Sequence, residues 1–425
     1  MTSRIIERRD GSAAADDAKT LLTAAAVRHG AVRMLQLAER GALADWTVDL
    51  DRLPATADFV ANVVRERHPR LDPPLHARWR HFVFSGRDLW REIVSSRHSP
   101  DTAAAARAQA RAAIDLAVTS VLLDAGAHPR WRFRDAATGL TAGRSEGLAL
   151  ASLRWFAGGA LSNDPKDPLR ADAAALRRLE TAALEAAFQA TADEPLPGAA
   201  GRTALLNRLG AAVAARPDLF ALEDSPRPGG LFDALARRAP QGLLPAAAIL
   251  ETVLEGLGSI WPDRVILAGV PLGDCWPHPD FQGPTAAGHY VPLHKLSQWL
   301  TYSLIEPLEA AGLCVTGIDA LTGLAEYRNG GLFTDMGVIV PRDAGAGSRI
   351  HGVADPFVVG WRALTVGLLD RLLPLVRGRL GLGIDAFPLA CMLEGGTWAA
   401  GRIIAREKRA DGGPPFQILS DGTVF

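Results

Sequence analysis

The residue types best suited to chemistry lie in a predicted helix with the sequence PLHKLSQWLTYSLIEPL. His294, Gln298 and Tyr302 are four residues apart, so a helix places them on one face, with Lys295 beside them. Leucines occupy the opposite face. Imidazole, amide, phenol and ammonium groups together can bind a polar substrate and move protons. The alternative is a solvated polar face. All three tyrosines of the chain lie in this helix or its flanking loops, which favours a site.

A second candidate is the segment Glu326–Gly331, EYRNGG, in which four polar residues precede two glycines. This pattern predicts a tight turn whose glycines let backbone approach a ligand closely. Glu326 is a candidate base, nucleophile or cation stabiliser. Arg328 is a candidate partner of Glu326 or ligand of a phosphate, and Asp335 is a second carboxylate. The alternative is a surface turn with a local ion pair.

A third candidate combines Asp274, Cys275 and His278 within five residues. These types suggest a metal ligand set or a thiol nucleophile, but the spacing matches neither a standard zinc site nor a known thiol signature. We predict no metal and no cofactor, and we interpret Asp274 as a hydrogen-bonding site residue. The segment Glu394–Trp398, EGGTW, is a weaker candidate, for which a surface ion pair is the favoured interpretation.

The elements that must position these residues are predicted to be mainly helical. Apolar spacing and alanine content predict helices at 17–40, 56–70, 102–125, 145–157, 168–191, 243–257, 292–312, 355–377, 384–394 and 397–409. A few short strands are expected in the C-terminal half, including 264–268, and the end of the chain is expected to be an extended tail or edge strand.

Long loops at 269–291 and 321–343 flank the 292–312 helix, and long loops in compact enzymes are usually functional. We predict a helical N-terminal lobe, 1–215, and a helical C-terminal lobe, 216–425, that carries most of the active site. One continuous domain is the alternative.

Composition excludes several classes of protein. The chain has 425 residues and a net charge of −1, so no basic excess points to nucleic acid. No apolar run is long enough to span a membrane. Three cysteines without a CxxC motif favour a reducing compartment, and we predict a cytoplasmic protein. Only four residues are lysine, so Lys295 is weakly informative as a place where a compact ammonium is wanted.

Long segments of the chain resemble the uracil-catabolism protein family of fungi and bacteria. The segments are HKLSQWLTYSLIEPL, LTGLAEYRNGGLFTDMGVIVP, WRALTV and GPPFQILSDGTVF, together with RSEGLALASLRWFAGGALSNDP and EGGTWAAGRIIAREKR. This resemblance implies a pathway that converts uracil to its ribonucleotide, opens the ring and releases urea, with a ribosylurea-type intermediate.

A remoter resemblance links three segments to the queuosine-salvage nucleotide glycosylases. LHKLSQ is similar to their YKRAQ helix, LTGLAEYR to their LTxxADYR segment, and GWRA to their EIRA segment. The likeness implies that Glu326 takes the place of the catalytic aspartate, with a side chain one methylene longer, and that Lys295 and Arg362 match a lysine and an arginine. Gly360 stands where those proteins have a glutamate. It also implies a large helical fold resembling helical, DNA-glycosylase-like N-glycosidases.

The resulting hypothesis is an N-ribosyl hydrolase that cleaves ribosylurea or ribosylurea 5-phosphate to urea and the ribose product. Glu326, Asp274 and Lys295 are the predicted catalytic residues. The predicted substrate-binding residues are His294, Gln298, Tyr302, Tyr327, Arg328, Asn329, Arg362 and Asp335. The expected partner is a small-molecule substrate, without nucleic acid or membrane. The alternatives are amide or ureido hydrolysis of the ring-opened nucleotide, and a non-catalytic protein that binds a pathway intermediate.

Overall fold

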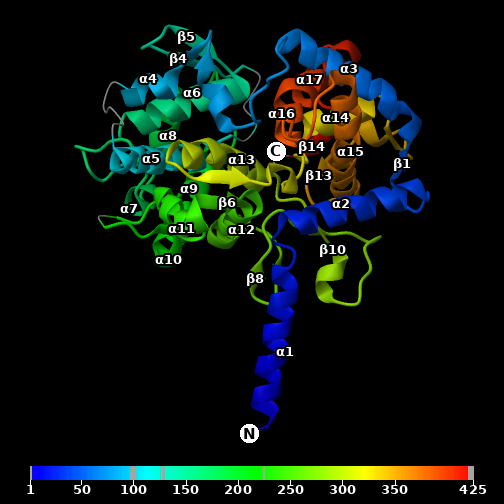
Figure 1. The fold of residues 1–425 in the computed structure, drawn as a ribbon, viewed down its shortest axis with the longest axis horizontal. Coiled ribbons are helices and arrows are strands. Elements are labelled where there is room, and N and C mark those ends of the chain that lie inside the picture. The colour runs from blue at the N-terminus through cyan, green and yellow to red at the C-terminus, as the bar shows by residue number, and fades with distance from the viewer. Residues whose placement is uncertain (1, 96–101, 125, 127–129, 224, 420–425) are drawn as a thin grey trace. The chain divides into compact units, whose positions relative to one another are not determined.

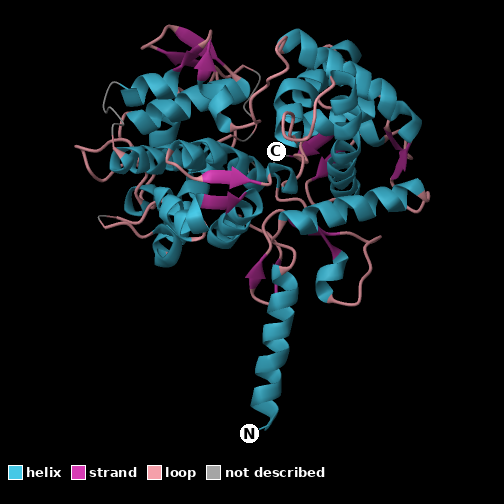
Figure 2. Cartoon of the chain, in the orientation of Figure 1, coloured by secondary structure: helices cyan, strands magenta, loops and turns pink. Residues whose placement is uncertain are grey.

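The computed structural model describes residues 2–95, 102–124, 126, 130–223 and 225–419. Helices dominate these residues and the strands are two or three residues long, so the predicted mainly α fold is confirmed (Figure 2). The chain divides into two compact units, each described separately. Unit 1 comprises residues 2–76, 263–298 and 317–419, and unit 2 comprises residues 77–262 and 299–316. Each unit is made of segments that are separated in the sequence. The division into lobes at 1–215 and 216–425, and the alternative of one continuous domain, stay predictions.

Unit 1 is organised around one long buried helix, α15 (Pro356–Leu380), which packs against α2, α3 and α14 (Figure 1). Proline in its first turn and Gly381 in a left-handed conformation after its last turn mark its two ends. The other helices of unit 1 are α1 (Thr2–Lys19), α2 (Ala24–Glu39), α3 (Leu53–Arg67), the start of α13 (Lys295–Ala310), α14 (Tyr327–Asp335), α16 (Leu389–Met392) and α17 (Trp398–Lys408).

The strands of unit 1 form two-stranded ladders that fasten loops rather than a central sheet. They pair β1 (Trp46–Val48) with β12 (Ile339–Pro341), β7 (Ile266–Leu267) with β8 (Val270–Pro271), β9 (Cys275–Pro277) with β10 (Tyr290–Pro292), and β13 (Ile350–Gly352) with β14 (Gln417–Leu419). The ladder of β9 and β10 is antiparallel and brings the loop after Asp274 back to the start of α13.

Unit 2 is also helical. Its helices are α4 (Leu89–Ser95), α5 (Ala103–Leu122), α6 (Arg144–Ala157), α7 (Ala173–Leu176), α8 (Thr181–Ala187), α9 (Ala199–Ala215), α10 (Pro217–Phe220), α11 (Leu231–Arg237), α12 (Ala246–Leu257) and the remainder of α13. Its strands are β2 (Val83–Phe84), β3 (Arg87–Asp88), β4 (Phe133–Asp135), β5 (Leu140–Ala142), β6 (Leu243–Pro245) and β11 (Cys314–Thr316).

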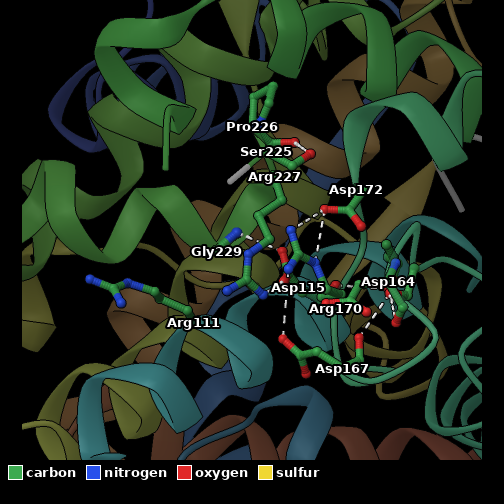
Figure 3. A network of polar contacts seen from close by, with 12 residues as sticks. Arg111, Asp115, Asp164, Asp167, Arg170, Asp172, Ser225, Pro226, Arg227 and Gly229 are labelled. Atoms are coloured by element: carbon green, nitrogen blue, oxygen red, sulfur yellow. Dashed lines mark hydrogen bonds and ion pairs between the residues drawn. The ribbon is translucent and has the colours of Figure 1, made fainter. Parts of the chain in front are cut away.

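A buried polar network fastens α5 of unit 2 to the loop before α11 (Figure 3). Asp115 accepts hydrogen bonds from Arg227 Nη1 at 2.7 Å and from the Gly229 N–H at 2.6 Å. Burial raises the pKa of Asp115 to about 6, although Arg227 and Gly229 act in the opposite direction. Arg170 and Asp172 form a neighbouring buried ion pair at 2.7 Å. Each carboxylate in this network is paired with an arginine, and only Arg227 Nε lacks a hydrogen-bond partner among the described residues, so we interpret the network as structural.

Several predicted elements differ from the observed ones. The 17–40 segment is two helices, because Thr23 caps the second one by accepting a hydrogen bond from the Ala26 N–H. The 168–191 segment is broken into α7 and α8. Short strands occur in both halves, not only in the C-terminal half, because pairs of two or three residues leave no periodic pattern in a sequence.

The predicted helices at 56–70, 145–157, 243–257, 292–312, 355–377 and 397–409 are confirmed, with boundaries shifted by a few residues. Residue 125, at the end of the predicted helix 102–125, and residues 420–425, at the end of the predicted tail, lie outside the described residues. Among the helices that the structure describes, none is long and apolar enough to cross a membrane.

Candidate active site

Glu326 is the residue immediately before α14 (Tyr327–Asp335). The predicted tight turn at 326–331 is wrong, because residues 327–331 are the first residues of this helix. The Glu326 carboxylate accepts hydrogen bonds from the N–H groups of Arg328 and Asn329, both at 2.7 Å, so it caps the helix N-terminus. The residue is only 9% exposed. Burial raises the pKa of Glu326, while the two N–H groups and the charges of Lys295 and His76 lower it in part. The site thus holds a desolvated carboxyl on which the charge of Lys295 acts.

Gly330 and Gly331 lie inside α14, and Gly330 permits close packing on α15. A Cβ added at Gly330 would lie 2.8 Å from the ring of Trp361 on α15, so the ring or the helix would have to shift. On the other side, Gly401 of α17 lies against the backbone of Arg328. Because Gly330 and Gly401 have no side chains, α15 and α17 pack in close contact with α14, the helix that Glu326 caps.

Asp274 and Arg362 form a buried bidentate ion pair, with N–O distances of 2.7 and 2.8 Å. Burial alone would raise the pKa of Asp274, but Arg362, the Lys295 N–H and the Trp276 indole outweigh it and hold that pKa well below its usual range. Arg362 is 1% exposed and also donates from Nε to the Ala325 carbonyl at 3.1 Å. One guanidinium therefore joins the loop at Asp274 to the residue before Glu326.

The start of α13 is fixed by the same carboxylate. Asp274 Oδ2 accepts the Lys295 N–H at 2.9 Å, and the Asp274 carbonyl accepts the N–H groups of Leu293 and His294. His294 precedes the helix with a φ of 47°, and its Nε2 lies 2.9 Å from the Leu21 carbonyl. Lys295, half-buried, is thus held at the first turn of α13, and its charge acts on Glu326.

The polar face predicted for this helix is buried rather than solvated. His294, Gln298 and Tyr302 are each 1% exposed or less. Gln298 Nε2 donates to Thr322 Oγ1 at 2.9 Å. Among the described residues no partner atom lies within hydrogen-bond distance of Gln298 Oε1 or of Asn329 Oδ1. The chain divides between Gln298 and Trp299, so Tyr302 belongs to unit 2 while the other predicted residues belong to unit 1.

Three predicted substrate-binding residues make contacts with the C-terminal segment or with each other. Arg328 donates from Nη1 to the Gly412 carbonyl at 2.9 Å and lies over the Tyr327 ring at 4.7 Å. Asp335, at the other end of α14, forms a bidentate ion pair with Arg409 at 2.6 and 2.7 Å. These contacts hold α14 against the residues that follow α17.

His76 and Glu394 form a buried pair that no pattern in the sequence predicts. His76 Nδ1 lies 2.6 Å from Glu394 Oε2, and the two residues are 318 positions apart in the chain. The side chains are 8% and 14% exposed, so the surface ion pair favoured for Glu394 is wrong. His76 carries no local signal, since it follows two prolines in an irregular segment. Only the glycine pair after Glu394 hinted at close packing.

The Asp274–His278 segment gives no sign of thiol chemistry. Cys275 is fully buried in β9, and burial raises the pKa of its thiol well above the ordinary value. Burial also lowers the pKa of His278. Within the part of the chain that the structure describes, no group of three or more His, Cys, Asp or Glu side chains is placed to hold a metal ion.

Comparison with known proteins identifies the family of this chain. Residues 20–425 match the family described as "Protein of unknown function (DUF1688)". The chain belongs to this family. It is 36% identical over 415 residues to "Protein urg3" of Schizosaccharomyces pombe, covering 95% of this chain and 98% of that protein. It is 36% identical over 411 residues to "Uracil catabolism protein 4" of Lachancea kluyveri, covering 89% and 91% of the two chains.

The match to the DUF1688 family spans every site residue described above, from His76 to Glu394. The resemblance drawn from sequence to uracil-catabolism proteins is confirmed. The family description states no activity, so the chemistry must be inferred from the site.

Proposed function

We propose that this protein acts in uracil catabolism as an N-ribosyl hydrolase that releases urea from ribosylurea 5-phosphate or ribosylurea. The pathway rests on the name of the Lachancea kluyveri relative, "Uracil catabolism protein 4", which is 36% identical over 89% of this chain. The reaction rests on one observation: a buried carboxyl, Glu326, whose two oxygens are fixed by the Arg328 and Asn329 N–H groups and on which the charge of Lys295 acts.

Cleavage of an N-ribosyl bond builds positive charge at the anomeric carbon. A carboxylate beneath the sugar stabilises that charge, and it either activates water or attacks directly. Glu326 suits this role because a desolvated carboxylate interacts strongly with a nearby cation. Each of its oxygens accepts one backbone N–H, which fixes the carboxylate in place and leaves acceptor capacity on both.

Lys295 is the residue proposed to hold an anionic part of the substrate, such as a 5-phosphate. Lys295 is the first residue of α13, where the helix dipole also favours an anion. The buried oxygens of Gln298 and Asn329 that lack partner atoms suit donors such as ribose hydroxyls or urea N–H groups.

Asp274 and Arg362 are proposed to position the site rather than to react. Their ion pair is buried, and Asp274 is held in its charged form, so it is a poor proton donor at neutral pH. By bonding the first residue of α13 and the carbonyl before Glu326, the pair sets the separation between Lys295 and Glu326.

Incubation of the purified protein with ribosylurea 5-phosphate, and separately with ribosylurea, tests the proposal. We expect stoichiometric urea and ribose (5-phosphate). Ammonia without urea would indicate amide or ureido cleavage instead. Saturable binding without any product would indicate a binding protein, and either result would contradict the proposal.

A further inference from the structure

His76 and Glu394 form a buried pair in unit 1 that is fixed by several contacts, as the Glu326 carboxylate is. The 2.6 Å hydrogen bond at His76 Nδ1 fixes the ring on one side, and the His76 backbone N–H donates to the Ala390 carbonyl at 3.1 Å. Both contacts reach the same short segment, Leu389–Thr397. The imidazole is therefore held by its backbone and by its ring at once.

Glu394 lies on a π-helical turn, Leu393–Thr397, between α16 and α17. Such turns are rare and are frequent at functional sites. Its two glycines let the turn lie against the chain that leads to His76: a Cβ at Gly395 would lie 2.7 Å from Pro73, and one at Gly396 would lie 2.7 Å from Val60 of α3. The π-helical turn and its two glycines thus let Glu394 approach His76. An α-helix with larger residues at 395 and 396 could not pack this closely.

The π-helical turn and α17 pack on α14, the helix that Glu326 caps. The hydroxyl of Thr397, fully buried in the same turn, has no partner atom among the described residues. His76 also lies close enough to Glu326 for its charge to act on that carboxyl. Glu326 thus lies within the electrostatic reach of both Lys295 and His76, and Glu394 is bonded to His76.

We propose that His76 is the catalytic acid that protonates the departing urea nitrogen, and that Glu394 is the positioning residue that orients its ring. This inference rests on the proposed N-ribosyl hydrolase activity. A carboxylate at Nδ1 stabilises the imidazolium and presents the Nε2 proton, the arrangement that proton-donating histidines need.

In this step the C1′–N bond breaks and its electron pair stays on nitrogen. The Nε2 proton of His76 joins that nitrogen, which leaves as neutral urea. Water forms a bond to C1′ and gives one proton to Glu326. That proton then passes to solvent and His76 takes one up, so the reaction consumes one water and both side chains return to their starting states.

Two substrates with different leaving groups separate the roles of His76 and Glu326. Urea nitrogen needs a proton to leave, whereas p-nitrophenolate leaves without one. We expect His76→Asn to lower kcat on ribosylurea 5-phosphate by about a hundredfold to a thousandfold with little change in KM. On p-nitrophenyl ribofuranoside 5-phosphate the same variant should lose only a few-fold, while Glu326→Gln should lose activity on both.

Glu394→Gln should show the same preference for the activated substrate with a smaller loss, and Glu394→Asp should recover part of it. His351→Asn is the matched control, because His351 is another buried histidine of unit 1, bonded to the Ala346 carbonyl and stacked on Phe357. It should leave the ratio of the two activities unchanged. Thermal unfolding of each variant reports whether it folds, and the ratio of activities is independent of the folded fraction.

An equal loss on both substrates for the His76 and Glu394 variants, or full activity on ribosylurea 5-phosphate, would overturn the inference and leave the hydrolase intact. If the unchanged protein turned over neither substrate, the proposed function itself would fail, and the inference with it.

Discussion

At the scale of single residues, Glu326 combines a structural role with the proposed chemical one. As the residue that caps α14, it satisfies two backbone N–H groups, and an equivalent cap contributes about 1 kcal/mol to stability. As a buried carboxyl it is held away from water, which raises its pKa. A cap needs only an acceptor, whereas stabilisation of a cation needs a negative charge, so substitutions can separate the two roles.

Asp274 makes stability depend on pH. Its pKa is lowered in the folded state, so the stabilisation is present above its unfolded value, about 4, and is lost as pH falls below that value. We expect Asp274→Asn to lower the free energy of unfolding at pH 7 by about 3–5 kcal/mol, because it leaves Arg362 buried without its partner. Its loss of stability in acid should also be shallower. Urea denaturation from pH 7 to pH 3 measures both effects.

Asp58→Asn is the control, since Asp58 pairs with Arg379 at the surface of unit 1 and is 60% exposed. It should change stability at pH 7 by less than about 1 kcal/mol. Equal effects of the two substitutions would contradict the positioning role of Asp274.

The three cysteines differ sharply in environment. Burial raises the pKa of Cys391 to about 12 and that of Cys275 well above the ordinary value, whereas Cys314 is exposed. A thiolate is the reactive form, so only Cys314 should react with a disulfide reagent in the native protein at pH 8. All three should react in denaturant. Fast reaction of a second native thiol would contradict the buried positions.

At the scale of elements, the sequence predicts the helices around the site but not α14, which carries several of its residues. The helices α15 and α17 that pack on α14 have apolar periodicity, which predicts both of them from the sequence. The sequence YRNGG has low helix propensity and was predicted to be a turn. Packing on α15 and α17 overrides that preference, because Gly330 and Gly401 allow backbone contact that larger residues would prevent.

Gly330→Ala tests this packing. A Cβ would meet the Trp361 ring at 2.8 Å and Thr365 Oγ1 at 2.9 Å, so we expect a loss of about 1–3 kcal/mol despite the better helix propensity of alanine. Gly378→Ala is the matched control: it lies in α15 with nothing within 4 Å of the added Cβ, and it should stabilise by up to about 1 kcal/mol. Chemical denaturation gives both values; stabilisation by both would contradict the packing.

At the scale of the whole molecule, the site collects residues that the sequence keeps far apart. The residue types of the stretch from His289 to Asp335 predict a site, and the polar residues around Asp274 predict its part in that site. Arg362 came from a family resemblance, because an arginine within an apolar helix carries no spacing signal of its own. His76 lies 318 residues from Glu394, and no local pattern can report a contact of that separation.

The site residues other than Tyr302 all belong to unit 1, and this has an observable consequence. Binding of ribose 5-phosphate should slow amide hydrogen exchange at the starts of α13 and α14 and in the π-helical turn at 393–397. The network around Asp115 and Arg227 in unit 2 should exchange as before, and ribose without phosphate should have a weaker effect. Protection confined to unit 2 would contradict the assigned site.

The central claim is tested most directly by urea release from ribosylurea 5-phosphate by Glu326→Gln, compared with the unchanged protein. Gln keeps one acceptor oxygen for the helix cap and removes the charge, so the variant should fold and bind substrate. We predict that kcat falls by at least about a hundredfold. Thr23→Ala, which removes the side-chain cap of α2, should lose about 1 kcal/mol of stability and keep its turnover. Near-normal urea release by folded Glu326→Gln would contradict the account.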